Sequence, residues 1–281
     1  MTRAKAIGMK LLEVSRKLGI SHQLILIRFF HERLLFRVSV SEYKNNLCLK
    51  GGTLLYSLQG NEARPTIDID FSGQKLSNDI EIIKNIFKQI LSLQCNDEVV
   101  FDVENIDLTP INENNQYLGI RIKVMAILAN IKQFVQLDIG FGDVITPASI
   151  SINYPVLLEE FDAPVLQAYT IETVVAEKLQ AIIVLAQLNS RMKDFYDIYT
   201  LINVKSINLE ILKDAIEQTF NNRQTRVNFD SVVFSKDFYQ DANRNKMWIA
   251  YLKKINIDNI SFETVVESIN QLVQNIFRKN Y

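Results

Sequence analysis

One segment, LCLKGGTLLYSLQGNEARPTIDIDFSG (residues 47–73), constrains the fold more than any other part of the sequence. A short apolar strand runs into a glycine pair, Gly51 and Gly52, and a helix-like stretch, LLYSLQ, follows. After a polar loop comes a second strand, IDIDF, in which Asp68 and Asp70 alternate with apolar residues. The pattern predicts a strand–helix–strand unit that brings the glycine turn and the acidic strand face to face.

The two aspartates of IDIDF lie on one face of the predicted strand, because successive side chains of a strand alternate between its faces. The alternating apolar residues, which we expect in the core, are Ile67, Ile69 and Phe71. Two neighbouring carboxylates repel each other unless a positive group lies between them, and Mg²⁺ completed by substrate phosphates is such a group. For an isolated Asp-x-Asp, a solvated acidic strand face is the more common explanation.

A third acid occupies a similar position later in the chain. In FVQLDIGFG the apolar residues of residues 135–141 alternate with polar or small ones, so Asp138 lies on the polar face of a core strand. If this strand neighbours IDIDF, three carboxylates converge and can hold one or two divalent ions.

The glycine pair sits where a strand meets the start of a helix. Backbone N–H groups at such a turn can receive an anion, with Gly51 and Gly52 permitting its close approach and Thr53 adding a hydroxyl. A tight turn is the commoner explanation of a glycine pair by itself.

Composition and pattern indicate a globular α+β protein. The 281 residues are 48% hydrophobic with a net charge of −1, so no global basic field indicates nucleic acid or anionic lipid. We expect an N-terminal helical arm (1–46), a mixed-sheet core (47–165) and a helical C-terminal domain (166–281). Without a signal sequence or a membrane-length apolar run, we expect a cytoplasmic protein. Isolated residues such as Cys48, Cys95, His22 and His31 are expected to be packing or surface residues.

The motifs LKGGTLLYSL, RPTIDIDF and QLDIGF together resemble those of the AbiEii/AbiGii toxin family of polymerase-β-like nucleotidyltransferases, over about residues 20–203. The resemblance implies a nucleotidyltransferase fold in which Asp68, Asp70 and Asp138 hold Mg²⁺ or Mn²⁺ and an NTP is the substrate. In that setting Arg64 either orients the acidic strand or meets phosphate.

Two motifs of the C-terminal half extend the resemblance. In IETVVAEKLQAII, Lys178 falls inside the apolar stripe, where a lysine needs an anionic partner or a route to solvent. The family's matching lysine is understood to contact the nucleotide's phosphates. In SRMKDFYDIYTL the resemblance favours Asp194 as an active-site acid, although the spacing also allows Asp194 and Asp197 to form ion pairs within the helix.

The resemblance also implies a biological role. We expect an NMP transfer from NTP to an acceptor, for which the family points to the 3′ end of tRNA, with growth arrest and abortion of phage infection as consequences. A cognate antitoxin, acting by contact or without it, is the expected partner. The alternatives are a small-molecule or protein acceptor, a non-catalytic nucleotide-binding protein of the same fold, and a structural protein whose acids only aid solubility.

Overall fold

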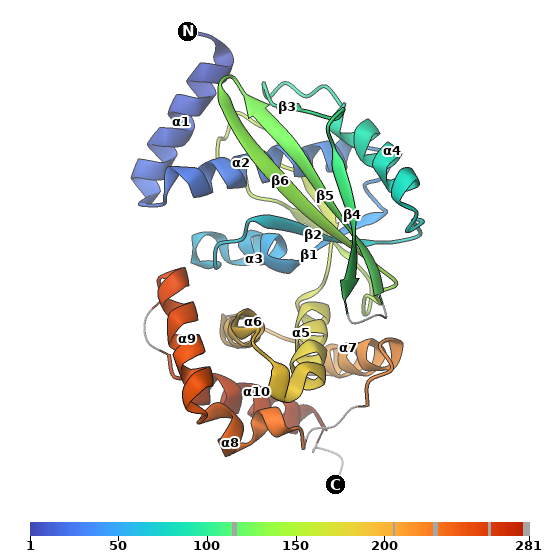
Figure 1. The fold of residues 1–281 in the computed structure, drawn as a ribbon, viewed down its shortest axis with the longest axis vertical. Helices are drawn as coiled ribbons and strands as arrows, with labels where there is room; N and C mark the ends of the chain where they lie inside the picture. The colour runs from blue at the N-terminus through green and yellow to red at the C-terminus, as the bar shows by residue number, and fades with distance from the viewer. Residues whose placement is uncertain (114–116, 205, 227–229, 258–259, 278–281) are drawn as a thin grey trace. The chain divides into compact units, whose positions relative to one another are not determined.

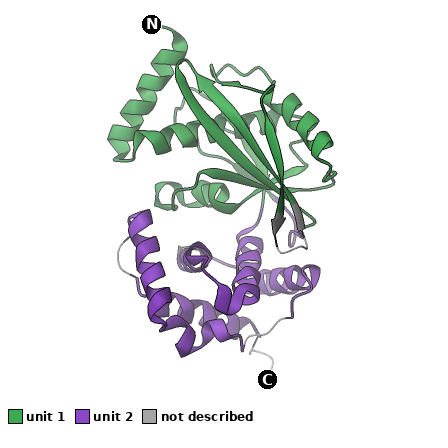
Figure 2. Cartoon of the chain, in the orientation of Figure 1, with its two compact units in different colours: residues 1–142, 150–168 green, residues 143–149, 169–281 purple. Residues whose placement is uncertain are grey.

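The computed structural model describes residues 1–113, 117–204, 206–226, 230–257 and 260–277. The chain divides into two compact units (Figure 2). Unit 1 comprises Met1–Gly142 and Ile150–Ala168, and unit 2 comprises Asp143–Ser149 and Tyr169–Tyr281. The chain therefore crosses from one unit to the other more than once.

Unit 1 begins with two helices, α1 (Arg3–Leu18) and α2 (His22–Val40). Thr2 caps α1 by accepting a hydrogen bond from the N–H of Lys5, and Gly19 ends this helix in the left-handed conformation. Helix α2 contacts strands of the sheet and is largely buried, so the N-terminal helices are part of the same unit as the sheet.

Helix α2 also buries charged side chains by pairing them. Arg37 donates to both carboxylate oxygens of Asp97, at 2.8 and 3.0 Å, and both side chains are almost fully buried. Arg33 pairs with Glu32 at 2.7 Å, and the carboxylate of Glu32 accepts a hydrogen bond from the N–H of Leu157. Asp97 and Leu157 lie in loops far along the chain, so their hydrogen bonds attach α2 to these loops and give its buried charges the partners that they require.

The centre of unit 1 is a mixed sheet (Figure 1). Its strand order is β3-β5-β6-β2-β1-β8-β7, and β4 pairs with β5. The β2–β6 and β1–β8 pairs are parallel and the others are antiparallel. The predicted α+β class with a mixed sheet is confirmed. The strands are β1 (Leu47–Lys50), β2 (Asp68–Gly73), β3 (Val100–Phe101), β4 (Asp107–Glu113), β5 (Tyr117–Leu128), β6 (Ile131–Phe141), β7 (Ile150–Asn153) and β8 (Val165–Ala168).

The faces of β2 and β6 alternate as their sequences predict. Ile69, Phe71, Leu137 and Ile139 have no exposed surface. Ile67 was expected in the core, but it precedes β2 and is 70% exposed, so that prediction is wrong. The remaining helical elements of unit 1 are α3 (Gly51–Gln59), the 3₁₀ turn η1 (Gly60–Glu62) and α4 (Ile80–Leu91).

Unit 2 is helical. An aromatic cluster forms part of its core, with Phe195 packed edge-on against Phe262 and Trp248 5.3 Å from Phe262 between ring centroids. Among the described residues of the whole chain, no helix is long and apolar enough to span a membrane. The elements are α5 (Ile171–Leu185), η2 (Ala186–Leu188), α6 (Met192–Val204), α7 (Leu209–Asn222), η3 (Val232–Phe234), α8 (Lys236–Tyr239), α9 (Ala242–Ile255) and α10 (Phe262–Phe277).

Candidate active site

Three aspartates converge on the polar face of the sheet. Strands β2 and β6 are parallel neighbours, and Asp70 lies directly opposite Asp138 in their register. One carboxylate oxygen from each of Asp68, Asp70 and Asp138 lies within 4.8 Å of the others, and all three residues are partly exposed. The condition on which the sequence prediction depended, that the two acidic strands are neighbours, is therefore met.

Arg121 on β5 joins this group, although none of the sequence motifs singles it out. It is paired with Asp138 in the antiparallel β5–β6 register, and its Nε and Nη2 donate to the two carboxylate oxygens at 2.8 and 2.7 Å. These hydrogen bonds are the main cause of the raised pKa of Arg121, and the charges of Asp68 and Asp70 also contribute. The only available sequence signal is the alternation in GIRIKV, which puts Arg121 on the polar face of its strand.

Gly51 makes room for one of the acids. Its φ is +66°, and a Cβ added to it would lie 1.9 Å from Oδ2 of Asp70, a distance that no real side chain could keep. A Cβ on Gly52 would lie 2.7 Å from Oγ1 of Thr66. Both glycines are thus required by the close approach of the first turn of α3 to the acidic strand and to the residues leading into it.

Thr53 is placed differently from the prediction that its hydroxyl meets phosphate. The residue is fully buried, and its Oγ1 donates to the backbone carbonyl of Asp68 at 2.8 Å. Thr66 donates to the carboxylate of the same aspartate at 2.6 Å. We therefore correct the role of Thr53: it fastens α3 to the start of β2, because a buried hydroxyl must use the partner beside it.

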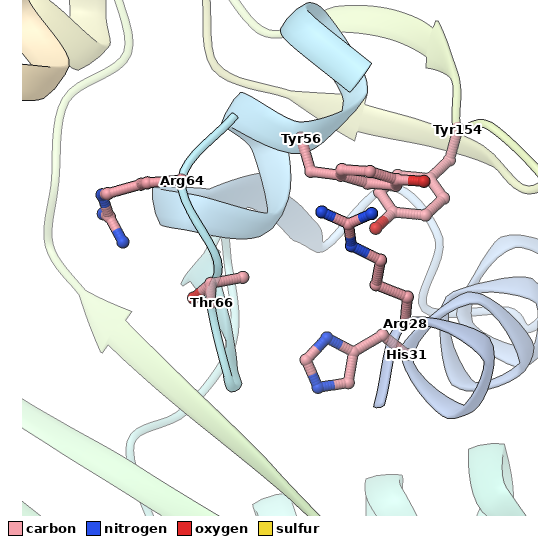
Figure 3. Close-up of a pocket in the computed structure, with 6 residues that line it drawn as sticks. All are labelled: Arg28, His31, Tyr56, Arg64, Thr66 and Tyr154. Carbon is pink, nitrogen blue, oxygen red and sulfur yellow. The ribbon is translucent and has the colours of Figure 1, made fainter. Parts of the chain in front are cut away.

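A small pocket lies beside the lead-in to β2, lined by Arg28, His31, Tyr56, Arg64, Thr66 and Tyr154 (Figure 3). Burial lowers the pKa of His31 to about 4, so its ring is neutral at pH 7, and it hydrogen-bonds the backbone of Ile67. The guanidinium of Arg28 lies 4.3 Å from the ring centroid of Tyr56 and donates to Asn61. His31 is thus a packing residue, one of the two roles expected for it, and it supports the segment that carries the acids.

In unit 2, Lys178 has the anionic partners that its position requires. Its Nζ lies 2.8 Å from Asp194 and 2.7 Å from Asp197, two carboxylates that are almost fully buried. Arg191 pairs with Asp194 at 2.7 Å, which is one of the helix ion pairs that the spacing allowed. Burial alone would raise the pKa of Asp194, but the charges of Lys178 and Arg191 outweigh it and lower this pKa.

The sequence was compared with models of known protein families. A family model described as "Nucleotidyl transferase AbiEii toxin, Type IV TA system" matches residues 33–268. The chain belongs to this AbiEii family. No curated protein matches the sequence.

Two crystal structures of Helicobacter pylori proteins support the nucleotidyltransferase fold of this AbiEii chain. A protein described as a candidate nucleotidyltransferase is 18% identical, and the match covers 92% of this chain and 97% of that one with a TM-score of 0.50. The protein JHP933 is also 18% identical, with 92% and 94% covered and a TM-score of 0.51. At this identity the likeness concerns the fold alone.

The acidic triad of the AbiEii chain fits a divalent metal ion. Its donors are all carboxylate oxygens, which Mg²⁺ and Mn²⁺ prefer, and their 4.8 Å spread suits a shared ion. Because Gly51 has no Cβ, the carboxylate of Asp70 can lie in this cluster. Lys178, Asp194 and Asp197 belong to unit 2, whereas the triad belongs to unit 1.

Proposed function

We propose that this AbiEii chain transfers an NMP group from an NTP to an acceptor in a reaction that depends on Mg²⁺ or Mn²⁺. The observation that carries the proposal is the convergence of Asp68, Asp70 and Asp138 on one sheet face beside the glycine turn, in a chain of a nucleotidyl transferase family. An isolated acidic strand would not require a third acid from a distant strand, nor a helix start that leaves room for one of the carboxylates.

In this proposal each residue has a task. Asp68, Asp70 and Asp138 hold the divalent ion, which when bound neutralises phosphate charge and lowers the pKa of the attacking hydroxyl. Gly51 and Gly52 present the first turn of α3, whose N–H groups receive phosphate oxygens. The first N–H groups of a helix have no acceptor inside the helix, which suits them to an anion.

From unit 2, Lys178 is proposed to contact the nucleotide's phosphates. Asp194 was expected in the active site itself, but its carboxylate is buried and paired with Lys178 and Arg191. We therefore give Asp194 and Asp197 a common role, which is to hold the ammonium group in place. Two carboxylates at hydrogen-bonding distance limit the rotation of this long side chain.

The acceptor and the biological context complete the proposal. We propose the 3′ end of tRNA as acceptor, growth arrest in the cytoplasm as the consequence, defence against phage as the setting, and a cognate antitoxin as the partner. The description of the family as a type IV toxin–antitoxin system supports the toxin role and the partner. A small molecule or a protein side chain is the alternative acceptor.

The test combines labelled nucleotides with matched variants. The purified chain is incubated with each α-³²P-labelled NTP, Mg²⁺ and total tRNA, and the product is then digested with nuclease or protease. Asp70→Asn and Asp138→Asn should lose both the labelled product and growth arrest on expression. Asp107→Asn, which removes an exposed carboxylate from β4 of the same sheet, should keep both. A D70N protein that still transfers label would refute the mechanism. A labelled product that protease destroys would show that the acceptor is a protein and not tRNA.

A further inference from the structure

Four adjacent strands place charged residues in one row across the polar face of the sheet. In the register Lys50 on β1 lies opposite Asp70 on β2, Asp70 lies opposite Asp138 on β6, and Asp138 lies opposite Arg121 on β5. Residues directly opposite each other in a sheet project from the same face. The two central carboxylates are therefore flanked by a cation on each side.

The cation beside Asp138 is held by geometry as well as by charge. Arg121 uses two parallel N–H···O bonds to bind both carboxylate oxygens, and the arrangement fixes the plane and direction of the carboxylate. A carboxylate oxygen that accepts one hydrogen bond still has a second lone pair, so Asp138 can be a metal ligand while it is paired. The arginine is thus placed as the outer partner of a metal-binding carboxylate.

The charges of the cluster give Arg121 a second effect. The three carboxylates carry three negative charges, and the guanidinium of Arg121 offsets one of them. Lys50 on the other side of the row offsets a second charge, so one divalent cation is enough to outweigh the remaining negative charge, and a further cation would need the phosphates of a nucleotide. The same guanidinium repels a bare cation and attracts an anionic nucleotide.

We propose that Arg121 is a positioning residue that orients Asp138, weakens the binding of a divalent cation by the nucleotide-free site, and favours the binding of the anionic nucleotide. The nucleotide part of this inference rests on the proposed function, whereas the cation part does not. Removal of the positive charge should therefore change the two affinities in opposite directions. A loss of structure around the site would weaken both.

The test measures Mn²⁺ binding by the full chain without nucleotide, using the electron paramagnetic resonance signal of free Mn²⁺. Glutamine keeps an N–H donor for the carboxylate of Asp138 but lacks the charge. For a unit charge about 5 Å from a divalent ion in a water-like dielectric, Arg121→Gln should therefore tighten Mn²⁺ binding about tenfold. Arg121→Lys keeps the charge and should bind Mn²⁺ within about twofold of the wild type. Binding of a fluorescent NTP analogue in the presence of saturating Mn²⁺ should weaken in R121Q.

Lys123→Gln is the matched control. Lys123 is two residues along the same strand and the same face and is exposed. It lies opposite Gln136 on β6 and Asp107 on β4, neither of which belongs to the triad. K123Q should leave Mn²⁺ binding unchanged. Weaker or unchanged Mn²⁺ binding in R121Q, the same tightening in R121K or K123Q, or no measurable Mn²⁺ binding by any of the proteins would overturn the inference. Because Mn²⁺ binding requires no turnover, a tightened R121Q together with an inactive wild type would overturn the proposed function and support the role of Arg121 toward the cation.

Discussion

Replacing Gly51 by alanine should separate two explanations of this glycine: it makes room for the carboxylate of Asp70, or it permits the close approach of a phosphate. The residue has a φ of +66°, and the added Cβ would lie 1.9 Å from Oδ2, 2.5 Å from Cγ and 2.7 Å from Cβ of Asp70. All three distances are shorter than any contact that the two side chains can keep. The G51A protein must therefore turn Asp70 away from the position in which it meets the other two acids.

The cost of this substitution has two parts. Holding a residue with a Cβ in the left-handed region costs about 1 kcal/mol or slightly more. Forcing the side chain of Asp70 away from its rotamer adds about 1 kcal/mol. Gly19 supplies the control, because its φ is +65° and no atom lies within 4 Å of the added Cβ. Gly19→Ala should have the first cost alone.

The two variants are compared by urea denaturation and by Mn²⁺ binding without nucleotide. We expect G19A to be destabilised by about 1 kcal/mol and to bind Mn²⁺ normally, and G51A to be destabilised by about 2 kcal/mol. The Mn²⁺ affinity of G51A should fall to that of Asp70→Asn, because both proteins lack the same ligand. If G51A binds Mn²⁺ as the wild type does and only its nucleotide binding weakens, the glycine serves phosphate and not Asp70.

Two further predictions concern buried charges. Burial lowers the pKa of His31 from 6.5 to about 4, so the unfolded chain takes up a proton first as the pH falls. The free energy of unfolding, measured by urea denaturation, should therefore fall by about 2 kcal/mol between pH 7 and 5. This loss should be absent in His31→Gln. Burial raises the pKa of Glu32 to about 7, which lowers stability with rising pH over the same range, and the comparison of the two proteins at each pH removes this contribution. Lys178→Met should destabilise the protein by about 3 kcal/mol, since it removes the ammonium group that lies against the buried carboxylate of Asp197, and adding Asp197→Asn should recover part of that loss. A double variant that is less stable than K178M would contradict this account.

The local pattern was sufficient to find the acids of the sheet but not their neighbours. Alternation in IDIDF and QLDIGF identified Asp68, Asp70 and Asp138, because the face of a strand is determined by a period of two residues. The same alternation applies to GIRIKV, yet it does not say which strand lies beside β5 or in which register. Arg121 was therefore missed, since its role depends on a pairing between strands that only the folded sheet defines.

Helix α2 shows a second limit. The sequence predicted a helical arm over residues 1–46, and charged residues between the apolar positions of a helix are normally solvated. In the structure Arg33 and Arg37 are almost fully buried, because Glu32 and Asp97 supply carboxylates at hydrogen-bonding distance. Asp97 lies in a loop far along the chain, so no local pattern could show that a charged face of this helix would be enclosed.

The donors around the triad explain how three like charges can share one sheet face. Asp68 accepts a hydrogen bond from Thr66, and Asp138 is paired with Arg121. Asp70 lies against Gly51 at the positive end of α3, where a negative charge is stabilised by the helix dipole. Each carboxylate therefore has its own compensating group from the protein. Because these groups come from the strands and the helix themselves, we expect the cluster to form when unit 1 folds, and a divalent cation then binds to carboxylates that are already in place.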